Sequence, residues 1–247
     1  MRIMIIGGTS GIGLALGAHY AAQGAHLALC GRDTGRLDGH VLAASPRVRR
    51  YGFDIADAAA VERALQDFGR EGLDILVVTA GQYADAAGLA AQPAVGPALV
   101  QTNIVGLVQA FDTAAGMMRR QGYGQLAAVA SVASVAGLLK EYPDGSLYSA
   151  SKRAAIAICD AYRKALAPFG IAVTALVPGY VDTARLRELN GGDAGAKPWL
   201  QSEAEAVRRM AEAIDQRAAR CVFPWQLHLT VRLFNCLPAW LRQLRRK

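Results

Sequence analysis

The sequence has few cysteines, histidines and charged residues, and these absences exclude several classes of protein. Its four histidines form no cluster with metal-ligand spacing. Its four cysteines form no CxxC pair and lie scattered at Cys30, Cys159, Cys221 and Cys236. Charged residues make up 19% of the 247 residues and hydrophobic ones 53%, which excludes a disordered chain. We therefore expect a reduced, metal-free, cytoplasmic protein.

Long hydrophobic runs, repeats and linkers are also lacking. The first residues, MRIMIIGGTS, hold only a few apolar side chains before the glycines, too short a run for a signal h-region or a membrane span. No internal repeat and no Ser/Pro-rich linker divides the sequence, and its length suits one large domain with a substantial core. We expect a single domain that begins with a buried strand.

Short apolar runs alternate with longer helical patterns along the chain. Strand-like runs occupy 2–7, 26–31, 47–54, 73–80, 125–131, 171–178 and 220–223. Helical patterns occupy 11–23, 34–44, 57–71, 96–121, 147–168 and 200–218, and a mobile Gly-rich loop is expected at 184–199. This alternation is typical of right-handed βαβ crossovers. The sequence predicts an α/β fold, a doubly wound, seven-stranded parallel sheet with helices on both faces.

The first strand-like run leads into the stretch GGTSGIG. It places Gly7, Gly11 and Gly13 at a strand-to-helix turn. Glycines permit tight turning and close approach of the backbone, and a helix N-terminus presents unpaired N–H groups to a pyrophosphate. Such turns also arise for packing alone, but the position after the first strand of a βαβ unit favours dinucleotide binding.

The end of the second strand bears on the choice of dinucleotide. Arg32 stands there in CGRDTGRL, where a guanidinium can meet a 2′-phosphate bidentately, so NADP is favoured. Asp33 follows and keeps NAD as an alternative, because an acidic residue at this point usually holds the ribose hydroxyls. A third interpretation makes Arg32 a solvated loop charge.

Two further strand ends are candidates for contacts with an adenosine. Asp54 ends the third strand, where its carboxylate can accept from an adenine amino group; the alternative role of helix N-cap suits Asp57 better. Gly81 ends the fourth strand, where it either lets the backbone pass near the ribose or makes a purely structural turn.

The stretch SLYSASK places a phenol, Tyr148, and an ammonium, Lys152, four residues apart on one helix face. A free phenol has a pKa of about 10, too high to act readily as a base near neutrality. A nearby cation favours the phenolate and lowers that pKa. The spacing therefore indicates that Lys152 acts on Tyr148.

These motifs, taken in order, resemble those of the classical short-chain dehydrogenase/reductase family. The resemblance spans about residues 2–183 and rests on GxxxGxG at 7–13, Thr79–Gly81, Asn103, Ser131, Tyr148-x-x-x-Lys152 and Pro178-Gly179. It implies a Rossmann-like fold and an NADP(H)-dependent oxidoreductase, with NAD(H) possible, that interconverts a carbonyl and a secondary alcohol. The alternative is a non-catalytic NADP(H) sensor or scaffold on the same fold, against which the intact catalytic set argues.

The resemblance also implies roles for individual residues. Tyr148 resembles the general acid/base, and Lys152 would tune it and hold the nicotinamide ribose. Asn103 resembles the anchor of a water chain behind the lysine; a hydrogen bond at a helix kink is the structural alternative, and both are compatible. Ser131 resembles the donor to the substrate oxygen and is favoured over Ser134. The expected cofactor-binding residues are Gly7, Thr9, Ser10, Gly11, Ile12, Gly13, Arg32, Asp54, Ile55, Ala80, Gly81, Tyr148, Lys152, Pro178, Gly179, Val181 and Thr183.

The chain departs from the family pattern at two places. Val78 and Thr79 stand where two asparagines are usual, and Ser10 stands where NADP-preferring members commonly have a basic residue. The first departure bears on local packing and the second on the choice of cofactor.

The helical patterns 96–121 and 147–168 are apolar or small on several faces, which predicts a homodimer through these two helices. The net charge of +7 lies mostly near the C-terminus: from Glu205 to Lys247, nine Lys/Arg accompany three Asp/Glu. A nucleic-acid binder would show a basic stripe with stacking aromatics, so we expect no nucleic-acid partner.

The last 24 residues, 224–247, form a basic amphipathic extension of the domain at 1–223. Leu, Phe and Trp alternate there with Arg. Plain packing or a lid over the substrate cleft is favoured; a block on a second subunit interface and a membrane-surface helix are the alternatives.

Overall fold

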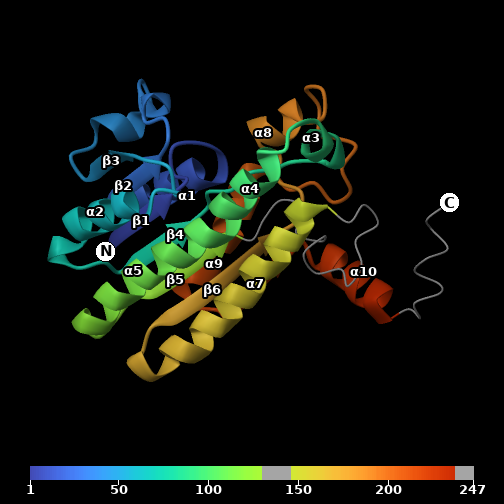
Figure 1. The fold of residues 1–247 in the computed structure, drawn as a ribbon. Helices are drawn as coiled ribbons and strands as arrows, with labels where there is room; N and C mark the ends of the chain where they lie inside the picture. The colour runs from blue at the N-terminus through green and yellow to red at the C-terminus, as the bar shows by residue number, and fades with distance from the viewer. Residues whose placement is uncertain (130–145, 237–247) are drawn as a thin grey trace.

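In the computed structural model, seven parallel strands form one sheet in the order β3-β2-β1-β4-β5-β6-β7 (Figure 1). The structure describes residues 1–129 and 146–236. The strands are β1 Arg2–Ile6, β2 His26–Gly31, β3 Val48–Gly52, β4 Ile75–Val78, β5 Gln125–Val129, β6 Ala172–Pro178 and β7 Arg220–Phe223. Every predicted strand is confirmed, as is the doubly wound fold class. The apolar runs cross a sheet that is covered on both faces, whereas β3, with Arg49 and Arg50 exposed, lies at the edge of the sheet.

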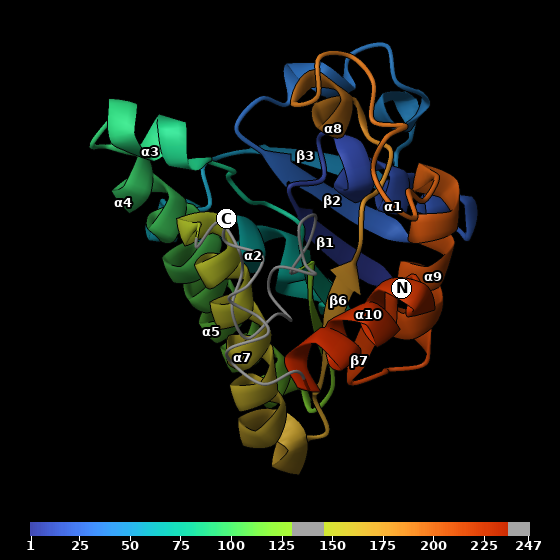
Figure 2. The same ribbon diagram turned by 90° about the vertical axis from the view of Figure 1, so that its right-hand side faces the viewer.

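Helices cover both faces of the sheet (Figure 2). They are α1 Gly11–Ala22, α2 Ala58–Phe68, α3 Ala86–Ala91, α4 Val95–Val100, α5 Gly106–Gln121, α7 Leu147–Leu166, α8 Ala184–Glu188, α9 Glu203–Asp215 and α10 Trp225–Cys236. One buried cluster joins the sheet to α2, α5 and α7, and the other joins it to α1 and α9. Alternate side chains of each strand therefore pack into different cores.

The structure corrects the predicted helix at 34–44. Only two short 3₁₀ turns form there, Gly35–Leu37 and Val41–Ala44, and Gly39 between them has a φ of +78°. The apolar residues Leu37 and Leu42 gave a helical spacing, but the backbone at Gly39 lies in the left-handed region, which ends a right-handed helix.

Two other predicted segments are divided more finely than expected. The pattern at 96–121 contains α4, a π-helical turn at Gln101–Val105 and α5. The loop at 184–199 begins with α8, whose N-cap Thr183 accepts a hydrogen bond from the Leu186 N–H at 3.2 Å. A short helix thus starts where only a mobile loop was expected.

The chain reverses its direction across the sheet between β1 and β4. From β1 it runs outward to β2 and β3, and from β4 it runs outward to β5, β6 and β7. The Ile6 carbonyl accepts from the N–H groups of Thr79 (2.8 Å) and Ala80 (3.0 Å), so the two strand ends are fastened together. Ligands of such sheets bind outside the carboxyl ends of the strands at this switch point.

Candidate active site

The glycine-rich turn packs against the end of β4. A Cβ on Gly13 would stand 2.2 Å from the Gly7 carbonyl oxygen, and one on Gly7, whose φ is +94°, would stand 2.4 Å from Thr79 Oγ1. A Cβ on Gly11 would meet no heavy atom within 4 Å. Gly7 and Gly13 are therefore required by packing, while Gly11 faces open space at the start of α1.

The N-terminus of α1 keeps its N–H groups available. Within the described residues, the Ser10 side chain makes no capping hydrogen bond, and the first turn of α1 contains no acidic residue. Unpaired N–H groups and the positive end of the helix dipole favour an anion at this point. The turn fits a dinucleotide pyrophosphate both in shape and in charge.

The two glycines give a matched pair of variants. Gly13→Ala is expected to cost about 1–3 kcal/mol of stability, because a backbone oxygen blocks the new methyl group. Gly11→Ala, with a φ of +49° and free space, should cost only about 1 kcal/mol. Thermal unfolding of the two apoproteins measures the difference, and equal melting temperatures would contradict the packing described above.

The end of β2 presents Arg32 and Asp33 to solvent, but only the acidic residue has partners. The Asp33 carboxylate accepts from the Gly35 N–H at 3.0 Å and pairs with Arg36 at 3.4 Å. Arg32 makes no hydrogen bond or ion pair with any residue in the part of the chain that the structure describes. Thr9 lies against this strand end, since a Cβ on Gly31 would stand 2.4 Å from Thr9 Oγ1.

The segment after β3 contains the predicted N-cap of α2. Asp57 caps α2 by accepting from the Ala60 N–H at 3.0 Å, which leaves Asp54 to accept from the Ala56 N–H at 3.0 Å. Ile55 is buried and packs against Gly106 of α5. N-capping by Asp57 is thus confirmed, and contact of Asp54 with adenine stays a prediction.

Tyr148 and Lys152 lie in the first two turns of α7. The helix begins there because Ser146 caps it, accepting from the Ser149 N–H at 3.2 Å. The Lys152 ammonium stands 5.6 Å from the centre of the Tyr148 ring. Burial lowers the pKa of Lys152 to about 8, and among the described residues no carboxylate forms an ion pair with it. An unneutralised cation beside a phenol is the arrangement that favours phenolate.

Asn103 connects the π-helical turn to the start of α7. Its Oδ1 accepts from the Gln82 N–H at 2.7 Å, and its Nδ2 donates to the Gln82 carbonyl at 2.9 Å and to Ser151 Oγ at 3.0 Å. Ser151 Oγ in turn donates to the Tyr148 carbonyl at 2.7 Å. Asn103 does make the hydrogen bonds of a helix irregularity, and π turns of this kind are frequent at functional sites.

Asn103 and Lys152 both lie close to Gly81, just after β4. A Cβ on Gly81 would stand 3.0 Å from Lys152 Nζ and 3.4 Å from Asn103 Oδ1. The fourth strand end, the π turn and α7 therefore converge there, as the ordered motifs predicted. Ser131 and Ser134 lie outside the described residues.

The segment after β6 runs along the same edge of the sheet. The Gly179 N–H donates to the Phe223 carbonyl at 2.7 Å, and this fixes the chain as it leaves Pro178. Val181 is fully buried, and its carbonyl accepts from the Thr183 N–H at 2.8 Å. Contact of Pro178, Gly179, Val181 and Thr183 with a cofactor stays a prediction.

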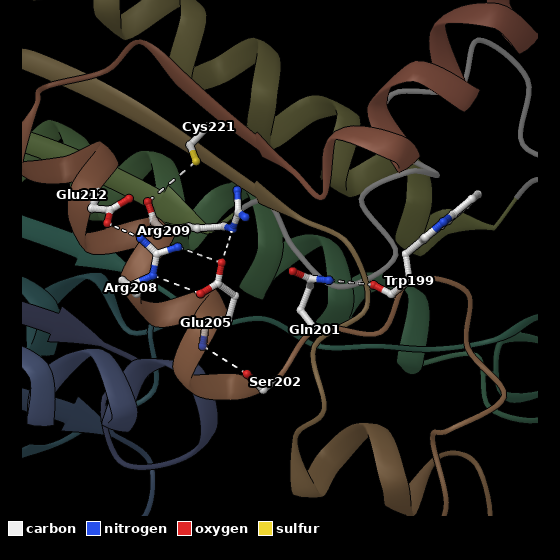
Figure 3. Close-up of polar contacts among 8 residues, drawn as sticks. All are labelled: Trp199, Gln201, Ser202, Glu205, Arg208, Arg209, Glu212 and Cys221. Atoms are coloured by element: carbon white, nitrogen blue, oxygen red, sulfur yellow. Dashed lines mark hydrogen bonds and ion pairs between the residues drawn. The ribbon is translucent and has the colours of Figure 1, made fainter.

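The loop that follows α8 ends at Gln201 and Ser202, directly before α9 (Figure 3). Residue Gln201 pairs with the segment after β6, and its side chain donates to the Trp199 carbonyl at 3.2 Å. Ser202 caps α9, accepting from the Glu205 N–H at 3.2 Å, and the Glu205 carboxylate pairs with Arg208 at 2.8 Å. Both ends of the loop are thus held beside the candidate site.

Comparisons with known proteins identify the family. The family model described as "short chain dehydrogenase" matches residues 1–194. The chain belongs to the short-chain dehydrogenase/reductase family. A putative ketoacyl reductase of the monensin polyketide synthase of Streptomyces virginiae is 32% identical over 207 residues, 78% of this chain and 75% of its own. An uncharacterized oxidoreductase of Mycobacterium tuberculosis is 29% identical over 231 residues, 91% of this chain and 88% of its own.

Solved structures agree on the fold of this short-chain dehydrogenase. A short chain dehydrogenase from Burkholderia cenocepacia, solved in complex with NADP, superimposes with a TM-score of 0.81 at 20% identity, covering 99% of this chain and 96% of that one. A second, from Streptomyces avermitilis, gives a TM-score of 0.79 at 22% identity and covers 99% and 94%. The family match makes the chain an oxidoreductase, and the solved structures share its Rossmann-like sheet.

The first departure from the family pattern, Val78 and Thr79, is explained by contacts at the end of β4. Val78 is buried in the sheet core, and Thr79 Oγ1 donates to the Ile6 carbonyl at 3.2 Å. Thr79 therefore ties β4 to β1 with its hydroxyl. At the second departure, Ser10 is exposed and contributes no charge at the start of α1.

Sequence reasoning missed an aromatic group beside Tyr148 and Lys152. The Tyr83 ring meets the Tyr148 ring edge to face, with 5.0 Å between centroids, and Tyr83 is 46% exposed. Burial, followed by repulsion from Tyr83, raises the pKa of Tyr180, and the Lys197 ammonium stands 5.5 Å from the Tyr180 ring. Only the sheet topology joins these residues, which come from three separate loops. Ser151, which links Asn103 to the Tyr148 carbonyl, was missed as well, although it stands inside SLYSASK.

Among the described residues, no group of three or more His, Cys, Asp and Glu side chains is placed to hold a metal ion. None of the helices in 1–129 and 146–236 has both the length and the apolar character needed to cross a bilayer.

Proposed function

We propose that this chain is an NADP(H)-dependent oxidoreductase that interconverts a carbonyl and a secondary alcohol. The observation that carries the proposal is the buried Lys152 ammonium beside Tyr148, without a carboxylate partner in the described residues. A purely structural lysine would be paired or would reach solvent, since a buried charge is costly. Absorbance changes of NADPH and NADH with a panel of carbonyl compounds test the proposal.

Each residue of the candidate site has a separate role in the proposed reaction. The Tyr148 hydroxyl delivers a proton to the carbonyl oxygen in reduction and removes it from the alcohol in oxidation. Lys152 stabilises the phenolate form, and Asn103 holds α7 in register with the end of β4 through Ser151. Ser131 donates a hydrogen bond to the same substrate oxygen in this proposal. The nicotinamide, when bound, supplies or accepts the hydride.

The dinucleotide site fits NADP(H) best at the end of β2. Asp33, the residue that would hold free ribose hydroxyls, is engaged by Gly35 and Arg36, whereas Arg32 has no partner among the described residues. The NADP carried by the related Burkholderia cenocepacia structure supports the same choice. A guanidinium at this position can bind the 2′-phosphate through two parallel hydrogen bonds.

Arg32→Gln is expected to weaken NADPH binding about 10- to 100-fold, the range for a lost charge-assisted hydrogen bond. Binding of NADH, which lacks the 2′-phosphate, should stay unchanged. Arg36→Gln, which removes a neighbouring cation already paired with Asp33, is the matched control. Titration of both dinucleotides by protein fluorescence measures the effect, and a parallel loss of both would remove Arg32 from the phosphate site.

The substrate is proposed to be an apolar or anionic carbonyl compound. Tyr83 and Tyr180 supply apolar surface beside Tyr148, and Lys197 adds a cation at the rim of this surface. The relative from Streptomyces virginiae is named a putative ketoacyl reductase, so ketoacyl compounds belong in the panel. Small apolar ketones test the contribution of the two tyrosine rings, and keto acids test that of the Lys197 ammonium.

A homodimer through α5 and α7 is part of the proposal. The outer faces of these helices carry small or apolar side chains that stay partly or fully accessible, including Val108, Ala154 and Ala157. In the described part of the chain, the buried Gln109 Oε1 has no hydrogen-bond partner. A second copy packed against this face would cover the apolar side chains.

A further inference from the structure

The last described helix, α10, exposes an apolar stripe. Trp225, Leu229 and Leu233 are 65%, 48% and 62% exposed. They are spaced four residues apart, so they lie within one narrow sector of the helix surface. Scattered exposed apolar residues are ordinary, but three large ones aligned along a single helix form a contact surface.

The position of α10 explains why this stripe covers no part of the core. The helix follows β7, the strand at the edge of the sheet, and lies beside that edge (Figure 2). The sheet faces are covered by other helices, α2, α5 and α7 on one side and α1 and α9 on the other.

The charge of the same segment points to the partner. Residues 224–247 contain five of the 27 Lys and Arg residues of the chain and none of its 20 Asp and Glu residues. Four of the five basic residues fall in the last six positions, in LRQLRRK. Exposed Trp and Leu together with a cluster of Lys and Arg are the combination that binds the headgroup region of an anionic bilayer.

We propose that α10 binds the surface of an anionic lipid bilayer, with Trp225, Leu229 and Leu233 inserted among the headgroups. The basic residues of the sequence 224–247 supply the electrostatic attraction to that surface. A second copy of the chain is a poorer occupant of this stripe. A two-fold contact through α10 would bring two acid-free basic segments together, and like charges repel. A lid is also disfavoured, because residues of a closed lid would bury their apolar side chains.

The experiment uses the intact chain and two kinds of vesicle, phosphatidylcholine alone and phosphatidylcholine with about 30% phosphatidylserine. The wild type should sediment with the phosphatidylserine vesicles, and added salt should weaken that binding. Leu229→Gln with Leu233→Gln should lower the affinity by roughly tenfold for each leucine. Arg245→Gln with Arg246→Gln should lower it as well.

The matched control is Val41→Gln, which removes a 79% exposed apolar side chain far from α10 in the sequence and should leave vesicle binding unchanged. Circular dichroism melting of each variant separates a lost contact from a lost fold. Equal sedimentation of wild type and both double variants would overturn the proposal. So would binding that depends on the arginines but not the leucines, or a change in solution mass, rather than vesicle binding, in the leucine variant.

Discussion

Tyr148→Phe is expected to lower kcat about 10³-fold, within the range for loss of a general acid–base group. The substitution removes one oxygen atom and leaves the ring, which packs edge to face against Tyr83 and closes the cluster with Ala84 and Leu99. Binding of NADPH should therefore change little. Steady-state kinetics and dinucleotide titration on the same preparation measure the two quantities.

Tyr83→Phe is the matched control for this prediction. It removes a phenol hydroxyl from the neighbouring ring, which is exposed and is not on α7. If Tyr83→Phe lost as much activity as Tyr148→Phe, the proton would have to pass through both hydroxyls. If Tyr148→Phe retained full activity, Tyr148 would not be the acid/base group.

Lys152→Met is expected to lower turnover at neutral pH by about 10²-fold or more, because the cation that favours phenolate is lost. Methionine is one atom shorter than lysine but keeps most of its volume and its flexible stem, so most of the packing near Gly81 is preserved. The midpoint of the rise in activity with pH should move toward the pKa of an ordinary phenol, about 10. The pH profile of kcat/KM measures this shift, and an unshifted profile would contradict it.

The same variant is expected to be more stable than the wild type as apoprotein. Burial depresses the pKa of Lys152 from 10.5 to about 8. Below pH 8 both states bind the proton and the wild type bears the full cost of the buried charge. Between pH 8 and 10.5 the unfolded chain binds more protons than the native one, so wild-type stability rises with pH.

At pH 7 the gain from Lys152→Met should be roughly 2–3 kcal/mol, and it should shrink as the pH rises to 10.5. Urea denaturation of both proteins at several pH values measures it. Lys197→Met, which removes a loop lysine that is only partly buried, is the control and should show no such pH-dependent gain. A Lys152→Met protein that is less stable than the wild type at pH 7 would mean that the ammonium is stabilised by its surroundings.

Most of the sheet could be predicted from the sequence because its strands are short apolar runs with glycine, proline or charged residues at their ends. The edge strand β3 is the exception, because Arg49 and Arg50 stand inside it and are exposed. Runs such as ILVV have one plausible place, the interior of a covered parallel sheet. The segment 34–44 could not be predicted in the same way. Its hydrophobic spacing fits a helix, and only the backbone conformation at Gly39 excludes one.

The part of the candidate site that lies on helices could be predicted, because its motifs require particular residues at particular spacings. Tyr148, Lys152 and Asn103 converge as the motifs indicated, because they lie on helices positioned by the sheet. Tyr83 and Tyr180 were not predictable, since loops bring them together and loop conformations carry little periodic signal. The exposed apolar stripe on α10 could not be predicted, because a buried helix can show the same spacing of apolar residues in its sequence.

The most direct test of the proposed chemistry is NADPH consumption with a panel of carbonyl compounds, run in parallel on the wild type and Tyr148→Phe. The wild type is expected to consume NADPH with at least one apolar or anionic carbonyl compound and to use NADH less well. Tyr148→Phe is expected to bind NADPH but to show almost no turnover. Two results would contradict the proposed chemistry: equal turnover by both proteins, or tight NADPH binding by the wild type without turnover of any compound, the behaviour of a sensor.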